Sequence, residues 1–329
     1  MEPSSGTENP PSEAFTPPSI YPQPLTTGSS YTHLSPIPPA LLADPRPPCA
    51  LGIDEAGRGP ALGPMVYAAL AVPLSSSTQL LRESHAFDDS KALTPAVRNR
   101  LMHALCSSAS DLFESCAWAV SVLSARDISA EMMRPAGPHT LNAQAFDATV
   151  HLIRQLCDAG VNVREIFVDA VGPPVPYQIR LQRLFPTASV VVANKADSLF
   201  PCVSAASICA KVTRDAALEH LYAARRPPSE SPSSPPSWGS GYPSDARCVT
   251  WMKTNMNPVF GWGPECRFSW STAKDMLDDG KTGAVKVDWP LPSDAHSSRV
   301  TDFFLPSADE RGSDELGSWF GTSVGVDAL

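Results

Sequence analysis

A short apolar run in this chain ends in two adjacent carboxylates, and this limits the folds that the chain can adopt. Residues 50–53 are apolar or glycine, and Asp54 and Glu55 follow directly. A buried strand is the simplest structure for this run, yet carboxylates at its end are costly to bury unless positive charge meets them. Oxygen ligands of this kind suit a hard cation such as Mg²⁺ or Mn²⁺. The segment therefore predicts a strand that delivers two acids to a cation.

A glycine-flanked arginine comes next: Gly57, Arg58 and Gly59 are followed by Pro60. Glycine lets a backbone approach a ligand closely, and successive N–H groups form a concave anion site. Metal-binding acids beside such a loop indicate phosphate-ester chemistry. A dinucleotide-binding loop is the alternative. It is disfavoured because Pro60 intrudes and the apolar run at residues 65–72 has the character of a strand, whereas that motif requires a helix.

Two more acids follow apolar runs farther along the chain. Asp169 comes after residues 166–168, and Asp197 comes after the valine-rich run 189–193. If these runs are neighbouring strands of one sheet, four carboxylates converge and raise one another's pKa. Two divalent cations about 4 Å apart would resolve that repulsion. A lone acidic pair is more often a solvated strand end, but four acids together with the glycine loop favour a metal site.

Charge and cysteine content restrict the classes of partner. The net charge is −9, but most of the excess acid lies before residue 49 and after residue 290, so the middle of the chain permits nucleic-acid binding. The eight cysteines are scattered without a C-x-x-C pair, and we expect them to be reduced. No apolar run reaches membrane-spanning length, and the N-terminus lacks a basic-then-apolar signal pattern. We therefore expect an intracellular protein with no membrane partner.

Strand-like and helix-like patterns alternate, which predicts an α/β architecture. Strands are expected at residues 50–54, 65–72, 116–123, 166–168 and 189–193, and helices at 94–108, 141–159 and 203–224.

Composition divides the chain into five parts. We expect a disordered Pro/Ser-rich tail at 1–48, a catalytic domain at 49–225 and a flexible Pro/Ser-rich loop at 226–238. A helical C-terminal extension at 239–289 and an acidic, mostly disordered tail at 290–329 complete the prediction.

Six motifs, in the same order, resemble type 2 ribonucleases H, the ribonuclease HII group. They lie at residues 54–60, 89–91, 167–169, 195–215, 239–243 and 258–270. The last two are similar to the catalytic A subunit of the eukaryotic enzymes in particular, and the resemblance covers about residues 49–280. It implies the ribonuclease H-like fold, a mixed central sheet flanked by helices, with a small helical C-terminal extension. It also implies hydrolysis of the RNA strand of RNA–DNA hybrids and incision at single ribonucleotides embedded in duplex DNA.

The resemblance also implies roles for individual residues. Asp54, Glu55, Asp169 and Asp197 would be catalytic and would bind two divalent ions, Mg²⁺ or Mn²⁺, in a cleavage that leaves 5′-phosphate and 3′-OH ends. The implied substrate contacts are those of Gly57, Arg58 and Gly59 with the ribose 2′-OH, of Tyr242 with the sugar across the RNA–DNA junction, and of Lys91 and Asn142 with phosphates. The implied partners are the substrate duplex and the B and C subunits of a heterotrimer, and the implied location is the nucleus.

Plainer interpretations stand beside these roles. Arg58 could be an ordinary ion-pair partner, and Tyr242 in its Gly-Tyr-Pro turn could simply pack. On spacing alone, Lys195, Lys211 and Arg214 belong to a solvated helix face. The main rival function is a catalytically silent nucleic-acid-binding scaffold, which the loss of any of the four acids would favour, and all four are present. A nicotinamide oxidoreductase is a second rival, but it needs a helix after the glycine loop.

Overall fold

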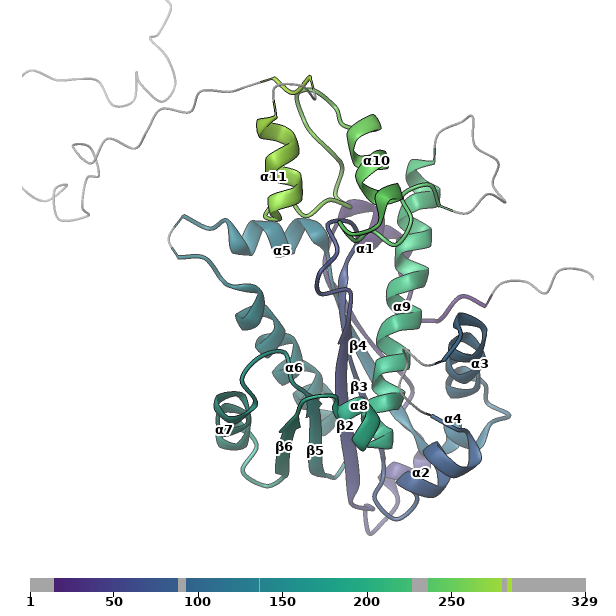
Figure 1. Cartoon of the computed structure of the whole chain (residues 1–329). Coiled ribbons are helices and arrows are strands. Elements are labelled where there is room, and N and C mark those ends of the chain that lie inside the picture. The colour runs from purple at the N-terminus through teal and green to yellow at the C-terminus, as the bar shows by residue number, and fades with distance from the viewer. Residues whose placement is uncertain (1–14, 88–92, 136, 227–235, 280–282, 286–329) are drawn as a thin grey trace, which may run out of the picture. The chain divides into compact units, whose positions relative to one another are not determined.

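The computed structural model describes residues 15–87, 93–135, 137–226, 236–279 and 283–285, and its central element is a mixed sheet (Figure 1). In this part of the chain the sheet has six strands in the order β1-β4-β3-β2-β5-β6. Their bounds are β1 Tyr31–Leu34, β2 Cys49–Ala56, β3 Met65–Pro73, β4 Ala117–Leu123, β5 Val163–Asp169 and β6 Ser189–Ala193. The first four strands in the spatial order pair antiparallel, whereas β2, β5 and β6 run parallel. The predicted mixed α/β sheet is therefore confirmed.

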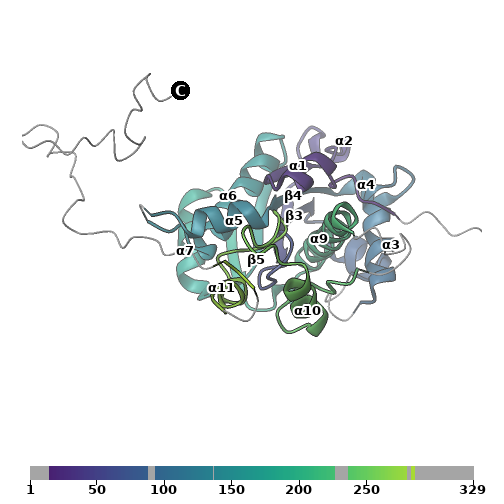
Figure 2. The same cartoon turned by 90° about the horizontal axis from the view of Figure 1, so that it is seen from above.

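Helices cover both faces of this sheet. Helix α9 (Pro201–Arg225) packs on β2 and β3, whereas α6 (Leu141–Asp158) packs on β3 and β4. Figure 2 shows these two helices on opposite sides of the strands, and a separate hydrophobic cluster lies beneath each of them. The other described helices are α1 Pro22–Thr27, α2 Pro39–Leu42, the π-helix η1 Thr78–Ser84, α3 Pro95–Cys106, α4 Asp111–Ser115, α5 Ala125–Met132, α7 Pro174–Leu184, α8 Ala196–Leu199, α10 Ala246–Thr254 and α11 Ser271–Asp278.

The backbones of β2 and α9 are in direct contact, which fixes this helix against the strand that carries Asp54. A Cβ on Gly52 would lie 2.1 Å from the carbonyl carbon of Cys202, so only glycine fits at the crossing. Helix α9 begins with Pro201, at a position where a missing N–H costs little. Strand β3 is covered on both faces and is buried along all but its last residue, which explains its unbroken apolar sequence.

The prediction of a disordered N-terminal tail is wrong for residues 15–48. Strand β1 joins the edge of the sheet by antiparallel pairing with β4, and Leu41 of α2 is fully buried. Ser19 Oγ lies 2.8 Å from Thr213 Oγ1 of α9 in a buried hydrogen bond. Proline is compatible with an edge strand and with the first turn of a helix. A proline-rich segment can therefore deliver single apolar side chains to a core that other elements build.

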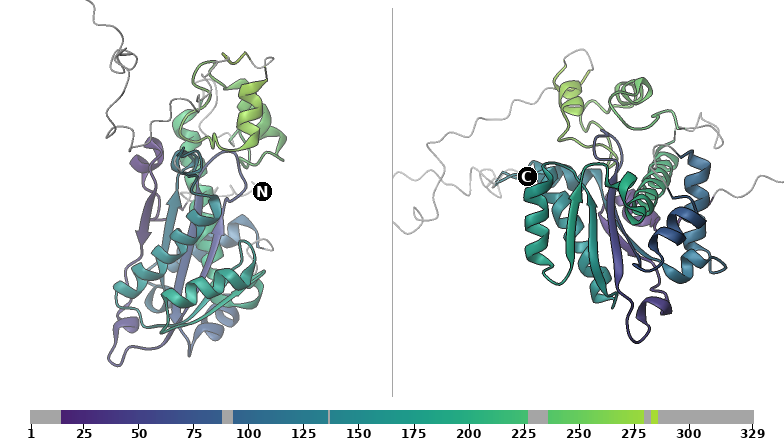
Figure 3. Two further views of the ribbon diagram at one scale, coloured as in Figure 1. Left: turned by 90° about the vertical axis from the view of Figure 1, so that its left-hand side faces the viewer. Right: turned by 60° about the horizontal axis from the view of Figure 1, so that its bottom comes forward.

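Some of the predicted features lie outside the described residues. These are Lys91, residues 1–14, most of the loop at 226–238 and the acidic C-terminal tail. Within the predicted extension at 239–289, the structure describes helices α10 and α11, coloured green to yellow in Figure 3. Among the described residues, no helix is both long enough and apolar enough to cross a membrane.

Candidate active site

Three of the sequence-predicted acids come from neighbouring strand ends. Asp54 and Glu55 lie near the end of β2, and Asp169 is the last residue of β5. The two strands run parallel with Ile53 opposite Val168, so Asp54 and Asp169 are the next pair along them. The structure therefore brings these acids to the same end of the sheet, as expected for adjacent parallel strands.

Asp197 comes from a helix instead of a strand end. Strand β6 ends at Ala193, and after a turn Asp197 lies in short helix α8, with only 1% of it exposed. The extended run stops because Lys195 has a left-handed backbone with φ 56°. The N–H of Ala196 donates to Asp169 Oδ1 over 2.8 Å, which ties α8 to the end of β5. A helix that is tied to the end of β5 therefore carries this acid, which corrects the interpretation that it follows its strand directly.

Asp54 is a tightly constrained carboxyl. It is 5% exposed, and its Oδ1 accepts from the Glu55 N–H at 2.7 Å. Burial raises the pKa of Asp54 well above its ordinary value, the negative charges of Glu55 and Asp169 raise it further, and a hydrogen bond with Ser207 opposes the shift. A divalent cation relieves such crowding, and an all-oxygen donor set suits Mg²⁺ or Mn²⁺. Among the described residues, no group of three or more acidic, histidine or cysteine side chains is already arranged to hold a metal ion. Asp54, Glu55 and Asp169 fit a metal by their oxygen chemistry and by the repulsion between them, which a cation would relieve.

The glycine loop after β2 contacts the start of α6. Gly57 has φ 77°, and a Cβ there would lie 2.7 Å from the carbonyl oxygen of Pro64, so glycine is required. Arg58 Nη2 donates to Asn142 Oδ1. Burial raises the pKa of Tyr67 well above its usual value, and the neighbouring Arg58 guanidinium lowers it. The structure therefore brings two of the predicted substrate-binding residues, Arg58 and Asn142, into direct contact.

Tyr242 lies against the same loop. A Cβ on Gly59 would be 3.3 Å from Tyr242 Cε1, so the aromatic ring rests against the bare glycine. The preceding residue, Gly241, has φ 78°, and its carbonyl accepts from the N–H groups of Ala61 at 2.9 Å and Leu62 at 3.2 Å. Tyr242 remains 36% exposed. The ring therefore presents an exposed surface immediately beside the glycine loop.

Two buried arginines behind this loop are absent from the sequence-based site. The assignment of Arg214 to a solvated face is wrong, because it is 6% exposed and its Nη2 donates to Ser240 O at 2.6 Å. Its guanidinium carbon lies 5.7 Å from the centre of the Tyr242 ring. Arg267 is fully buried. A signal for Arg214 was present, since it lies seven residues after Ser207 and therefore on the same face of α9.

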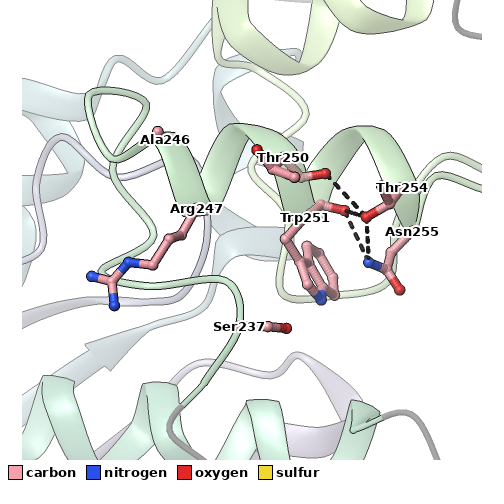
Figure 4. A pocket seen from close by; sticks show the side chains of 7 residues that line it. All are labelled: Ser237, Ala246, Arg247, Thr250, Trp251, Thr254 and Asn255. Atoms are coloured by element: carbon pink, nitrogen blue, oxygen red, sulfur yellow. Dashed lines mark hydrogen bonds between the residues drawn. The ribbon is translucent and has the colours of Figure 1, made fainter. Parts of the chain in front are cut away.

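Pockets near the C-terminal extension and α6 do not contain the acids. The pocket in Figure 4, of about 410 Å³, is lined mainly by α10 residues, including Arg247 and Trp251. A second pocket, of about 240 Å³, is lined by Asn142 and Arg180 among others. The second one extends the candidate substrate surface from the glycine loop toward α7.

This sheet order, with carboxylates at the adjacent ends of β2 and β5 beside a glycine loop, defines the ribonuclease H-like class of nucleases. A sequence model of the family described as Ribonuclease HII matches residues 51–273. The chain belongs to the ribonuclease HII family. It is a ribonuclease H, an enzyme that hydrolyses the RNA strand of RNA–DNA hybrids.

Individual relatives agree with this assignment. The A subunit of ribonuclease H2 from Neurospora crassa is 54% identical over 319 residues, which cover 96% of this chain and 97% of the relative. The human protein of the same name is 39% identical over 271 residues, covering 82% and 86%. The crystal structure of the ribonuclease H2 from Pyrococcus horikoshii matches with a TM-score of 0.54 and 27% identity, covering 69% of this chain and 96% of that one. The predicted family and fold are both confirmed.

Proposed function

We propose that the enzyme incises at single ribonucleotides embedded in duplex DNA, in addition to cleaving longer hybrids. The observation that carries this proposal is the contact between Tyr242 and Gly59, which places an exposed aromatic ring beside the glycine loop. Such a ring can pack on a deoxyribose while the loop meets the ribose 2′-OH, the group that DNA lacks. A single RNA–DNA junction supplies both contacts, so one ribonucleotide is a sufficient target.

In this proposal Asp54, Glu55, Asp169 and Asp197 hold two divalent ions, Mg²⁺ or Mn²⁺. Support comes from the burial of Asp54 and its repulsion by Glu55 and Asp169. When bound, the ions supply positive charge for water activation and for the departing 3′ oxygen. The protein contributes orientation, because the Ala196 N–H holds one oxygen of Asp169 in place. The products carry 5′-phosphate and 3′-OH ends.

The chain acts, in our proposal, as the catalytic member of a nuclear heterotrimer, with B and C subunits as its partners. The support is the name of its relatives, each of which is called the A subunit of ribonuclease H2. Co-purification of the tagged chain from nuclei should recover two further polypeptides. A chain that lacks residues 291–329 should recover less of them. Recovery of the full-length chain alone would contradict the assembly.

The decisive experiment uses a labelled DNA duplex that contains one ribonucleotide. Incubation with Mg²⁺ should give a single cut at that ribonucleotide, with 5′-phosphate and 3′-OH ends, and a chelator should prevent the cut. An all-DNA duplex of the same sequence should stay intact. A protein that binds both duplexes and cuts neither would be the silent scaffold. Cleavage of long hybrids without incision at the lone ribonucleotide would refute the narrower substrate proposal.

A further inference from the structure

One buried side chain bonds to three carbonyl groups of the glycine loop. Arg267 lies between α10 and α11 and is fully buried. Its Nη2 donates to Gly57 O at 2.6 Å, its Nη1 to Arg58 O at 2.8 Å and its Nε to Gly63 O at 3.0 Å. All three bonds run from a charged donor to a backbone acceptor, and bonds of this kind are stronger than neutral ones. The arginine therefore holds both ends of the loop.

A neighbouring side chain binds the carbonyl that Arg267 does not reach. Trp270 Nε1 donates to Gly59 O at 3.1 Å. The Arg267 guanidinium carbon lies 4.8 Å from the centre of the same indole ring, so the two side chains support each other. The main chain adds a further link, since the Arg267 N–H donates to Ala61 O at 2.9 Å. Carbonyls along the whole loop are therefore directed toward the C-terminal extension.

Because the loop carbonyls point toward the C-terminal extension, the geometry of the peptide bond makes the adjacent N–H groups point away from it. In a planar trans peptide the C=O of one residue and the N–H of the next point in opposite directions. Because Gly57 O and Arg58 O face Arg267, the N–H groups of Arg58 and Gly59 face away from it. Gly59 is exposed, so a ligand can reach this part of the loop. Two aligned N–H donors suit an oxygen acceptor such as a ribose hydroxyl or a phosphate.

A lysine could not replace this arginine in the same geometry. Burial, together with the nearby charge of Arg214, lowers the pKa of Arg267 to about 9, so the guanidinium still carries its charge at neutral pH. The planar fork of arginine reaches several acceptors at fixed angles, whereas an ammonium group is a compact point charge on a flexible stem. The three carbonyls are spread around such a fork.

We propose that Arg267, assisted by Trp270, is a positioning residue for ribonucleotide recognition. The two side chains hold the loop carbonyls so that the N–H groups of Arg58 and Gly59 are preset to meet the 2′-OH. The preference for a ribonucleotide over a deoxyribonucleotide is then set partly by the C-terminal extension, far in sequence from the acids. This inference rests on the proposed incision at single ribonucleotides.

The test compares binding of two duplexes that differ by one hydroxyl group. For the full-length chain with Mg²⁺, kcat and KM are measured on a duplex with one ribonucleotide, and Ki is measured for the all-DNA duplex as a competitor. The ratio of Ki to KM reports the preference. Arg267→Met should lower this ratio about tenfold, which corresponds to about 1.4 kcal/mol, with Ki within about twofold of wild type. Arg267→Lys should recover only part of the loss. Lys274→Met, on the exposed face of α11, is the control and should change nothing.

A second variant keeps the proposal testable if Arg267→Met does not fold. Trp270→Phe preserves an aromatic ring but removes the N–H to Gly59 O, and it should lower the preference about threefold while the melting temperature stays close to that of wild type. Hydrogen exchange of the amides at 57–63 should become faster in this variant. A folded Arg267→Met or Trp270→Phe protein with wild-type preference would overturn the proposal, as would equal losses for both duplexes. A wild-type chain without any preference would instead refute the proposed function.

Discussion

Residues 15–48 provide a sharp test of the structure, because their composition alone predicts that they do not contribute to the stability of the fold. Leu41 of α2 is fully buried in the hydrophobic cluster on the α6 face of the sheet, whereas its neighbour Leu42 is 41% exposed. The two residues have the same side chain and lie in the same short helix. Substitution of each by alanine therefore isolates burial from helix propensity.

The expected cost follows from that difference in burial. Leu41→Ala removes a fully buried side chain and leaves a cavity, which should lower the free energy of unfolding by about 2–5 kcal/mol. Leu42→Ala should change it by less than about 0.5 kcal/mol. For a folded unit of this size, a loss of about 3 kcal/mol lowers the melting temperature by about 6–12 °C. Removal of residues 1–44 should destabilise the protein at least as strongly, since it also takes away β1.

Urea unfolding followed by circular dichroism measures the free energy directly, and a thermal scan gives the melting temperature. Equal m-values for wild type and the two alanine variants are required, because they show that only stability has changed. If Leu41→Ala and Leu42→Ala unfold at the same urea concentration, α2 does not pack on the core and the segment is a disordered tail after all.

Three further outcomes concern the active site. Asp169→Asn keeps an acceptor for the Ala196 N–H but removes a charge, so it should abolish cleavage and preserve hybrid binding. Activity within about tenfold of wild type would contradict a role of Asp169 as a metal ligand. Asp275→Asn on α11 is the control. Asp54→Asn should raise the melting temperature in chelator, because it removes a buried charge that Glu55 and Asp169 repel, and a lower temperature would argue against crowding. Tyr242→Ala should reduce incision at a lone ribonucleotide about tenfold more than cleavage of a long hybrid, and equal losses would exclude a junction contact.

The sequence was sufficient to predict the elements whose cause is local. Strands β2 and β3 are apolar runs of strand length, and α6 shows a helical spacing of apolar residues. The grouping of Asp54 and Asp169 also followed from the pattern, because acids at the ends of two neighbouring parallel strands lie at the same edge of the sheet. The sequence also predicted a glycine loop after β2 that lets the backbone approach a ligand, and the structure adds that Gly57 in this loop has a positive φ.

Features that depend on distant partners could not be predicted in this way. Arginine is usually a surface residue, and the burial of Arg214 is stabilised by a carbonyl of Ser240, which lies in another segment, as well as by the adjacent Asp215. Strand β1 is short and proline-flanked, and it exists because the edge of β4 accepts it. The apolar run before Asp197 predicts a strand end there, because residue propensities do not reveal the turn at Lys195. For Arg214 and β1 the deciding energy is a contact between segments that no local pattern encodes.

The link between Arg58 and Arg267 spans 209 residues, and this has a consequence for biosynthesis. A ribosome produces the N-terminal part of a domain first, so all four acids emerge before the arginine that bonds to the glycine loop. If Arg267 sets the loop as proposed, a growing chain has its carboxylates well before it has the full preference for RNA over DNA. Premature termination between Asp197 and Arg267 would yield a product that retains every acid but lacks the loop support. Under this proposal, the part of the preference that depends on Arg267 arises only after all four acids have been made.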